Sequence, residues 1–257
     1  MKTRRVLRWT LPLVVGTLSA ILFLFGFGAA LRGGAGEPVG EPAPVAVPAE
    51  QATVRPLRIL LLGDSLARGT GDSTGRGVGG NLAEVLGEDG SRKIEVVNLA
   101  VNGARTRDLA AKIERSSIRD LSAQSEAIIV SIGGNDLFGL SIEPDGSFAP
   151  PGDEPRAHYQ NVLDRVIGIV TDLRESAPES RIYLVGLYDP FRHRGQNLGG
   201  YVTAWNGDLA AAFADDPGIT VVPTADLFVA ADRLSADRFH PGDEAYALIA
   251  RRIADTF

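Results

Sequence analysis

The chain has 257 residues, 44% of them apolar and 23% charged, which is typical of a globular protein with one large core. It contains no cysteine, which excludes disulfides, thiolate nucleophiles and metal sites built on cysteine. The net charge is −6, and because residues 1–56 carry six basic and three acidic side chains, residues 57–257 carry −9. A net-negative domain without a basic stripe argues against nucleic acid as a partner.

The N-terminal part predicts attachment to a membrane. Residues 1–10 form a basic lead, and residues 11–31 contain no charge over a length that can span a hydrocarbon core of about 30 Å as a helix. We favour an uncleaved transmembrane anchor over a cleavable signal peptide, because the apolar run exceeds the ~7–15 residues of a usual signal core. The basic lead predicts a cytoplasmic N-terminus. Either interpretation puts the rest of the chain outside the cytoplasm, membrane-bound or secreted.

Residues 32–56 contain five prolines and show no hydrophobic periodicity. This composition predicts an extended, semi-rigid linker. A separate domain is expected over residues 57–257.

Within that domain, strand-like and helix-like patterns alternate. Apolar strands are predicted at 57–62, 94–99, 127–132, 182–187 and 219–222. Amphipathic helices are predicted at about 78–87, 106–122, 155–176, 201–214 and 243–256. This order is typical of an α/β fold, with a parallel sheet covered by helices on both faces through right-handed crossovers.

A serine follows the first predicted strand, in Gly63-Asp64-Ser65-Leu66. Open α/β sheets bind their ligands at the carboxyl ends of the strands, where this serine lies. Ester hydrolysis by a serine also needs an imidazole base, a carboxylate that orients the base, and donors for the oxyanion.

The imidazole is chosen from three histidines. His158 is expected to be exposed at a helix start, and His193 lies in a basic loop that disfavours a second cation. His240 follows Asp237 by three residues, a spacing that lets the carboxylate reach the ring Nδ1–H from one turn. As a bare pattern, an aspartate three residues before a histidine also fits a solvated loop.

Donors follow the next two strands, in Asn98-x-x-x-Asn102-Gly103 and in Gly133-Gly134-Asn135-Asp136. Each pattern alone also fits an ordinary turn, because Asn-Gly and Gly-Asn are turn dipeptides. In a parallel sheet, however, the ends of the first three strands meet at one edge. The donors and Ser65 are therefore expected to lie together.

These four blocks, in this order, resemble those of the GDSL or SGNH hydrolase family, and the resemblance covers about 57–257. Further stretches are similar to membrane-anchored bacterial lipase/acylhydrolase members. The family implies a flavodoxin-like, three-layer α/β/α sandwich with a five-stranded parallel sheet. It implies Ser65 as nucleophile, His240 as general base and then acid, and Asp237 as the residue that orients His240. It implies an oxyanion hole made by the N–H groups of Ser65 and Gly103 and the side-chain amide of Asn135.

The sequence therefore predicts a serine esterase or lipase-type acylhydrolase that works through an acyl-serine intermediate, with no cofactor or metal. Lipid or other acyl esters are the first substrate hypothesis, and O-acetylated envelope polysaccharide is the alternative. A catalytically silent envelope binding domain is a rival from a different class.

A metal-dependent phosphoesterase built on Asp64, Asp72, Asp136 and His240 is disfavoured, because the aspartates lack partner histidines. For Asp64 and Asp136 we expect capping and loop hydrogen bonds rather than contact with substrate. Four loop residues are expected to pack against the core rather than line an acyl pocket: Phe138, Leu140, Phe148 and Phe191.

Overall fold

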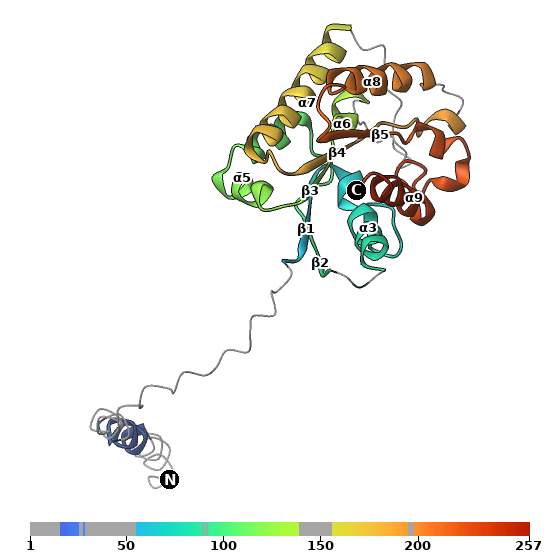
Figure 1. Cartoon of the computed structure of the whole chain (residues 1–257). Helices are drawn as coiled ribbons and strands as arrows, with labels where there is room; N and C mark the ends of the chain where they lie inside the picture. Colours follow the sequence, from blue (N-terminus) through green and yellow to red (C-terminus); the bar gives the residue numbers. More distant parts are fainter. Residues whose placement is uncertain are drawn as a thin grey trace. The chain divides into compact units, whose positions relative to one another are not determined.

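The computed structural model describes residues 16–25, 28, 55–88, 90, 92–138, 156–194 and 198–257. The chain divides into two units, Met1–Thr53 and Val54–Phe257. The second unit carries the α/β fold, which Figure 1 shows as helices around a central sheet.

Little of the first unit is described. Residues 16–25 are helical, but no helix among the described residues is both long and apolar enough to cross a membrane. Of the predicted anchor at 11–31, only residues 16–25 and 28 are described, so the anchor stays a prediction. Other predicted segments lie outside the described residues. They are the basic lead at 1–10, the remainder of 11–31 except residue 28, and most of the linker at 32–56.

Five parallel strands form one sheet in the order β2-β1-β3-β4-β5, which confirms the predicted fold class. The strands are β1 (Leu57–Gly63), β2 (Ile94–Asn98), β3 (Ala127–Ser131), β4 (Arg181–Val185) and β5 (Ile219–Val222). The central strands β1 and β3 are buried almost throughout, as expected for a parallel sheet covered on both faces.

Helices follow the strands in turn. They are α2 (Ser65–Arg68), α3 (Gly77–Gly87), α4 (Thr106–Ile113), α5 (Ser116–Ala123), α6 (Gly134–Leu137), α7 (Arg156–Ser176), α8 (Gly199–Ala212) and α9 (Asp243–Ala254). The prediction of one helix over 106–122 is wrong. Arg115 has an extended backbone (φ −69°, ψ 131°), which separates α4 from α5.

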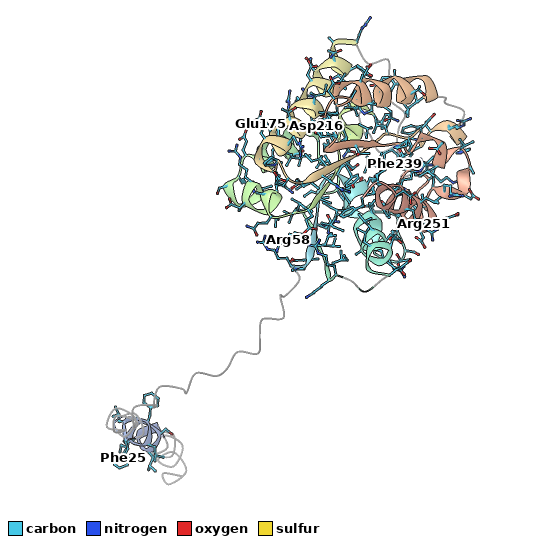
Figure 2. All side chains as sticks on the ribbon, viewed as in Figure 1. Phe25, Arg58, Glu175, Asp216, Phe239 and Arg251 are labelled. Carbon is cyan, nitrogen blue, oxygen red and sulfur yellow. The ribbon has the colours of Figure 1, made fainter. Side chains whose placement is uncertain are left out.

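Side chains of β1 alternate between two cores. Leu60 and Leu62 pack on one face with residues of α4, α7 and α8, whereas Ile59 and Leu61 pack on the other with residues of α3 and α9. This period of two is the expected consequence of the pleated strand. Figure 2 shows charged side chains such as Arg251, on α9, at the periphery of the unit.

The strand order places a topological switch point beside β1. The chain passes from β1 to β2 on one side, and then returns to form β3 on the other. The loops after β1 and β3 therefore leave the same edge in opposite directions, which creates the crevice where ligands bind in such sheets. Ser65 and Asn135 lie directly after these two strands.

Strand β4 ends earlier than predicted, at Val185 instead of residue 187. The side-chain amide of Asn206 accepts from the N–H of Leu187 (2.8 Å) and donates to its carbonyl (2.9 Å), replacing ladder hydrogen bonds. Leu187 is thereby released from the sheet and becomes available to line a cavity.

We predict that Gly63→Ala severely destabilises the protein. Gly63 has φ +120°, and a Cβ there would lie 1.8 Å from the carbonyl oxygen of Ser131. Backbone strain and overpacking together predict a loss of about 3 kcal/mol or more in the free energy of unfolding, measured by urea denaturation. The matched control is Gly168→Ala in α7, where a Cβ meets nothing within 4 Å. It is expected to stabilise by about 0.5–1 kcal/mol, and equal effects at the two positions would contradict the packing described for Gly63.

Candidate active site

Ser65 is the first residue of α2, directly after the turn that ends β1. The Asp64 carboxylate accepts a hydrogen bond from the N–H of Leu66 (3.1 Å) and caps this short helix. Gly69 ends the helix in a left-handed conformation (φ +94°). The turn fixes the Ser65 hydroxyl at the sheet edge, where it is 2.8 Å from Nε2 of His240.

His240 and Asp237 come from one tight turn before α9. Asp237 Oδ2 lies 2.6 Å from Nδ1 of His240, and Oδ1 accepts from the backbone N–H groups of Phe239 and His240, both at 2.9 Å. The hydroxyl of Ser235 donates to the same oxygen at 2.7 Å. Four hydrogen bonds therefore fix the orientation of the carboxylate relative to the imidazole ring.

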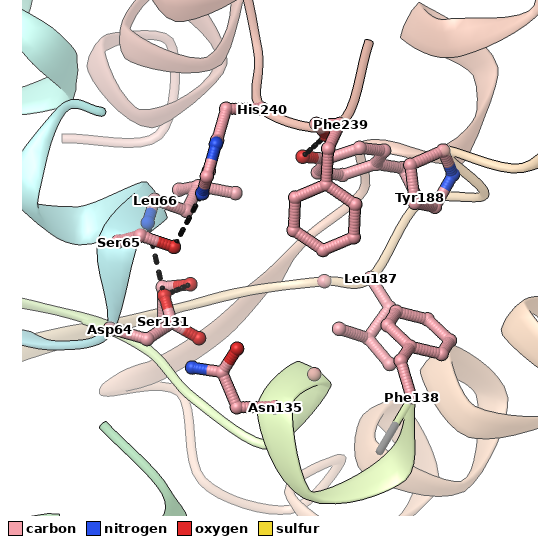
Figure 3. Close-up of a pocket in the computed structure, with 13 residues that line it drawn as sticks. Asp64, Ser65, Leu66, Ser131, Asn135, Phe138, Leu187, Tyr188, Phe239 and His240 are labelled. Carbon is pink, nitrogen blue, oxygen red and sulfur yellow. Dashed lines mark hydrogen bonds between the residues drawn. The ribbon is translucent and has the colours of Figure 1, made fainter. Parts of the chain in front are cut away.

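Electrostatics fix the imidazole tautomer. Burial would raise the pKa of Asp237, but hydrogen bonds from His240, Ser235 and the two backbone N–H groups outweigh it and hold the pKa well below its usual range. An ionised carboxylate only accepts hydrogen bonds, so Nδ1 carries the proton in the neutral ring. Nε2 is then the acceptor and faces the Ser65 hydroxyl (Figure 3).

Contacts between two distant loops hold Ser65 near His240. Gly71 has φ +96°, and a Cβ there would lie 2.6 Å from the Pro241 carbonyl oxygen and 2.9 Å from Cβ of His240. The Tyr246 hydroxyl, on α9, donates to the carbonyl of Thr70 at 2.7 Å. Only glycine allows the loop after α2 to approach the histidine this closely.

The candidate oxyanion donors lie on the two neighbouring segments. Asn135 is 4% exposed, and its Nδ2 donates one hydrogen bond to the carbonyl of Ala104 at 2.8 Å. Gly103, which precedes Ala104, has φ +75°. Asn135 and Ser65 line one pocket, while Gly103 lines a different cavity with Asn102 and Ala104. The structure thus joins Ser65, His240 and Asp237 directly, and joins Asn135 to the Gly103 loop.

The pocket beside Ser65 is small, with a cavity volume of about 40 Å³ and a partly aromatic lining. Its apolar wall is formed by Phe138, Leu187, Tyr188, Pro190 and Phe239, and Figure 3 shows several of these facing Ser65, Asn135 and His240. Burial raises the pKa of the Tyr188 phenol, which stays neutral and donates to the carbonyl of Phe239 at 2.7 Å.

The prediction that four loop residues pack against the core does not have the same outcome for all of them. Phe191 is buried and packs edge-on against Phe138, with ring centroids 5.8 Å apart. Phe138 is also buried, but it lines the pocket as well. Leu140 and Phe148 lie outside the described residues.

Asp64 and Asp136 have the expected structural hydrogen bonds. Besides its cap, Asp64 accepts from the hydroxyl of Ser131 at 2.9 Å, and Asp136 accepts from Thr106. Among the described residues, no group of three or more histidine, aspartate or glutamate side chains is arranged to hold a metal ion.

His158 does not match its predicted exposure. It is half-buried, and its Nε2 lies 3.0 Å from the carbonyl oxygen of Asp136, because α7 packs beside α6. His193 has an exposed side chain with Nε2 3.4 Å from the carbonyl of Phe228. Neither lines the pocket beside Ser65.

Sequence reasoning missed Ser131 and Gly71. Ser131 ends a run of buried apolar residues at the same sheet edge as Ser65, which is a signal comparable to those at the ends of β1 and β2. Gly71 belongs to a glycine-rich loop, but the need for glycine arises from its positive φ and from its close approach to His240 and Pro241, which follow 169 and 170 residues later in the chain.

Comparisons with known proteins agree with this architecture. The chain matches the GDSL-like Lipase/Acylhydrolase family over residues 61–248. It is 30% identical over 213 residues to the uncharacterized protein YpmR of Bacillus subtilis (strain 168), covering 79% of this chain and 82% of that one.

Two solved structures share the fold. The lipase Lip_vut3 from a goat rumen metagenome has a TM-score of 0.66 at 22% identity, covering 78% of this chain and 97% of that one. An acetyl xylan esterase from Geobacillus stearothermophilus has a TM-score of 0.57 at 20% identity, covering 78% of this chain and 94% of that one.

We predict that Asp64→Asn changes the pH dependence of stability. Burial raises the pKa of Asp64 to about 6 from its ordinary 3.8, against the opposing hydrogen bonds from Ser131 and Leu66. Because the folded-state pKa is the higher one, stabilisation by the neutral carboxyl is complete below pH 3.8 and is lost as the pH rises through 6.

The difference between the folded and unfolded pKa values of Asp64 corresponds to roughly 3 kcal/mol in the free energy of unfolding. The Asn variant keeps the cap acceptor and does not ionise, so its stability relative to the parent should rise by up to that amount between pH 4 and pH 7. Urea denaturation at both pH values measures this difference. A difference that is constant with pH would contradict the buried, titrating carboxyl.

Proposed function

Because the chain belongs to the GDSL-like lipase/acylhydrolase family, we propose that it is a serine esterase that cleaves carboxylic esters through an acyl-serine intermediate. The observation that carries the proposal is the unbroken series of hydrogen bonds from Asp237 through His240 to Ser65, at 2.6 and 2.8 Å. Each group in this series has the role that nucleophilic catalysis by serine requires.

In the proposed reaction the Ser65 oxygen attacks the ester carbonyl carbon while Nε2 of His240 removes the hydroxyl proton. Asp237 stabilises the imidazolium that forms, because its carboxylate is already ionised and hydrogen-bonded to Nδ1. The tetrahedral intermediate collapses as the C–O bond to the alcohol breaks, and Nε2 returns the proton to the alkoxide. Water then repeats the sequence on the acyl-serine and releases the carboxylic acid.

The oxyanion is proposed to be bound by the N–H groups of Ser65 and Gly103 and by the side-chain amide of Asn135. The amide of Asn135 has two N–H bonds, and the carbonyl of Ala104 accepts one of them. The other is proposed to donate to the substrate oxygen, because Asn135 lines the same pocket as Ser65. A buried donor held in this way stabilises developing charge without reorganising during the reaction.

The pocket volume supports short acyl groups. A water-sized group needs about 10–15 Å³ of such space, so the cavity of about 40 Å³ holds roughly three such groups. We therefore expect acetyl to butyryl esters to be the preferred substrates. The small volume favours small-acyl esters over long-chain lipids as substrates. It also favours the alternative substrate, O-acetylated carbohydrate, because one fold neighbour is an acetyl xylan esterase.

We predict that Ser65→Ala abolishes hydrolysis of p-nitrophenyl acetate, lowering kcat by at least about 10³-fold because the nucleophile is lost. The assay is run with EDTA present, which the parent should tolerate. The matched control is Ser117→Ala, at an exposed position of α5, with the parent rate expected. Full activity in Ser65→Ala would overturn the mechanism, and an inactive parent across ester substrates would favour a silent binding domain.

A second prediction concerns acyl length. Across p-nitrophenyl acetate, butyrate, octanoate and palmitate, kcat/KM should fall at least tenfold between butyrate and octanoate, because the cavity holds roughly three water-sized groups. Leu187→Ala removes part of the pocket wall and should reduce the difference in kcat/KM between butyrate and octanoate. Leu227 is a half-buried leucine of the other core, and Leu227→Ala should leave this difference unchanged. A parent enzyme that prefers octanoate or palmitate would refute the short-acyl proposal.

A further inference from the structure

A buried carboxylate fixes the start of α4. Asp136, on α6, accepts hydrogen bonds from the backbone N–H of Thr106 (Oδ2, 2.9 Å) and from its hydroxyl (Oδ1, 2.7 Å). Thr106 is completely buried, and the Asp136 side chain is 6% exposed. Both carboxylate oxygens are therefore used within a single contact between two segments that follow different strands.

These two segments carry the proposed oxyanion donors. Asp136 directly follows Asn135, and Thr106 lies three residues after Gly103. Asn135 also donates to the carbonyl of Ala104, two residues before Thr106. At two positions, Ala104 and Thr106, the loop after β2 and the turn after β3 are thus joined. Their separation determines how far the Gly103 N–H lies from the amide of Asn135.

Helix α7 holds the same contact from the outside. Nε of Arg165 donates to the Thr106 hydroxyl oxygen at 2.8 Å, and its Nη2 lies 3.6 Å from Oδ1 of Asp136. His158, one of the histidines outside the pocket, donates from Nε2 to the carbonyl of Asp136 at 3.0 Å, because a carbonyl oxygen can only accept. A 21-residue helix provides a rigid support for both side chains.

We propose that Thr106, Asp136 and Arg165 form a positioning cluster that sets the spacing between the Gly103 N–H and the Asn135 amide for oxyanion binding. The proposal rests on the proposed esterase function. The three residues do not line the pocket beside Ser65, so they act through the donors and are not catalytic residues themselves. Oxyanion donors must be placed accurately, since a displacement of about 1 Å costs on the order of 10²-fold in rate.

A purely structural role makes a different prediction. If the cluster only joined α4, α6 and α7, its loss would reduce stability and leave kcat per folded molecule unchanged. If it positions the donors, kcat falls while KM is kept, because the oxyanion forms only in the transition state.

The first test is Thr106→Val, which removes the hydroxyl and keeps the shape and the backbone N–H bond to Asp136. With p-nitrophenyl acetate we expect kcat to fall about 10- to 100-fold and KM to change less than twofold. Thr106→Ser restores the hydroxyl and should recover most of the rate. Thermal melts monitored by circular dichroism establish that each variant is folded at the assay temperature.

The second test compares two aspartates that both pair with arginines of α7. Asp136→Asn should lower kcat in the same way as Thr106→Val. Asp216→Asn breaks the pair between Asp216 and Arg174 (3.0 Å) away from the pocket, so it reports the effect of losing such a pair on the fold alone. Its kcat is expected to equal the parent's.

The deciding test is a double-mutant cycle with Asn135→Ala. In that background Thr106→Val should lower kcat less than about threefold further, because one of the two donors whose spacing the cluster sets is already absent. Independent, multiplicative losses would overturn the proposal, as would a parent kcat in Thr106→Val. If Ser65→Ala is inactive while either result occurs, the positioning role alone fails. Activity retained in Ser65→Ala would instead refute the esterase mechanism itself.

Discussion

The site depends on a single imidazole with two hydrogen bonds, one in which the ring donates and one in which it accepts. The ionised Asp237 requires a donor at Nδ1 of His240, which leaves Nε2 as the acceptor for the Ser65 hydroxyl. The strongly lowered pKa of Asp237 follows from four hydrogen bonds within one turn, so the orientation of the ring is decided locally. The remaining requirement is to bring Ser65, 175 residues away, to the free nitrogen.

A parallel sheet meets this requirement because all of its strands end at one edge. The switch point between β1 and β3 places Ser65 beside Asn135, and α9 carries the histidine turn against the loop that follows α2. Glycines at positions 63 and 71 allow backbone approaches that no side chain would permit. The cores on the two faces of the sheet give this edge its rigidity.

Much of this arrangement could be predicted from local patterns. Apolar runs located the strands, and polar residues after them located Ser65, Gly103 and Asn135, because parallel strands share an edge. Asp237 and His240 share one turn, so their contact depends on spacing alone. The resemblance to GDSL hydrolases added the roles of these residues; the family match confirms the family, and the roles stay predictions.

What the sequence could not predict depends on contacts between distant segments. The break at Arg115 interrupts a helical pattern that is locally continuous. The early end of β4 follows from Asn206, which replaces the ladder with its own amide. Hydrogen bonds from Thr106 to Asp136 and from Ser131 to Asp64 join residues 30 and 67 positions apart. No periodicity in the sequence records which polar side chains will meet across such separations.

The most direct measurement of the central claim is covalent labelling with a fluorophosphonate, followed by peptide mapping with mass spectrometry. A serine activated by His240 should give one adduct per chain, on Ser65, and labelling should slow strongly in His240→Ala. An unlabelled Ser65 in folded protein, or an adduct on another serine at the same rate, would contradict the account.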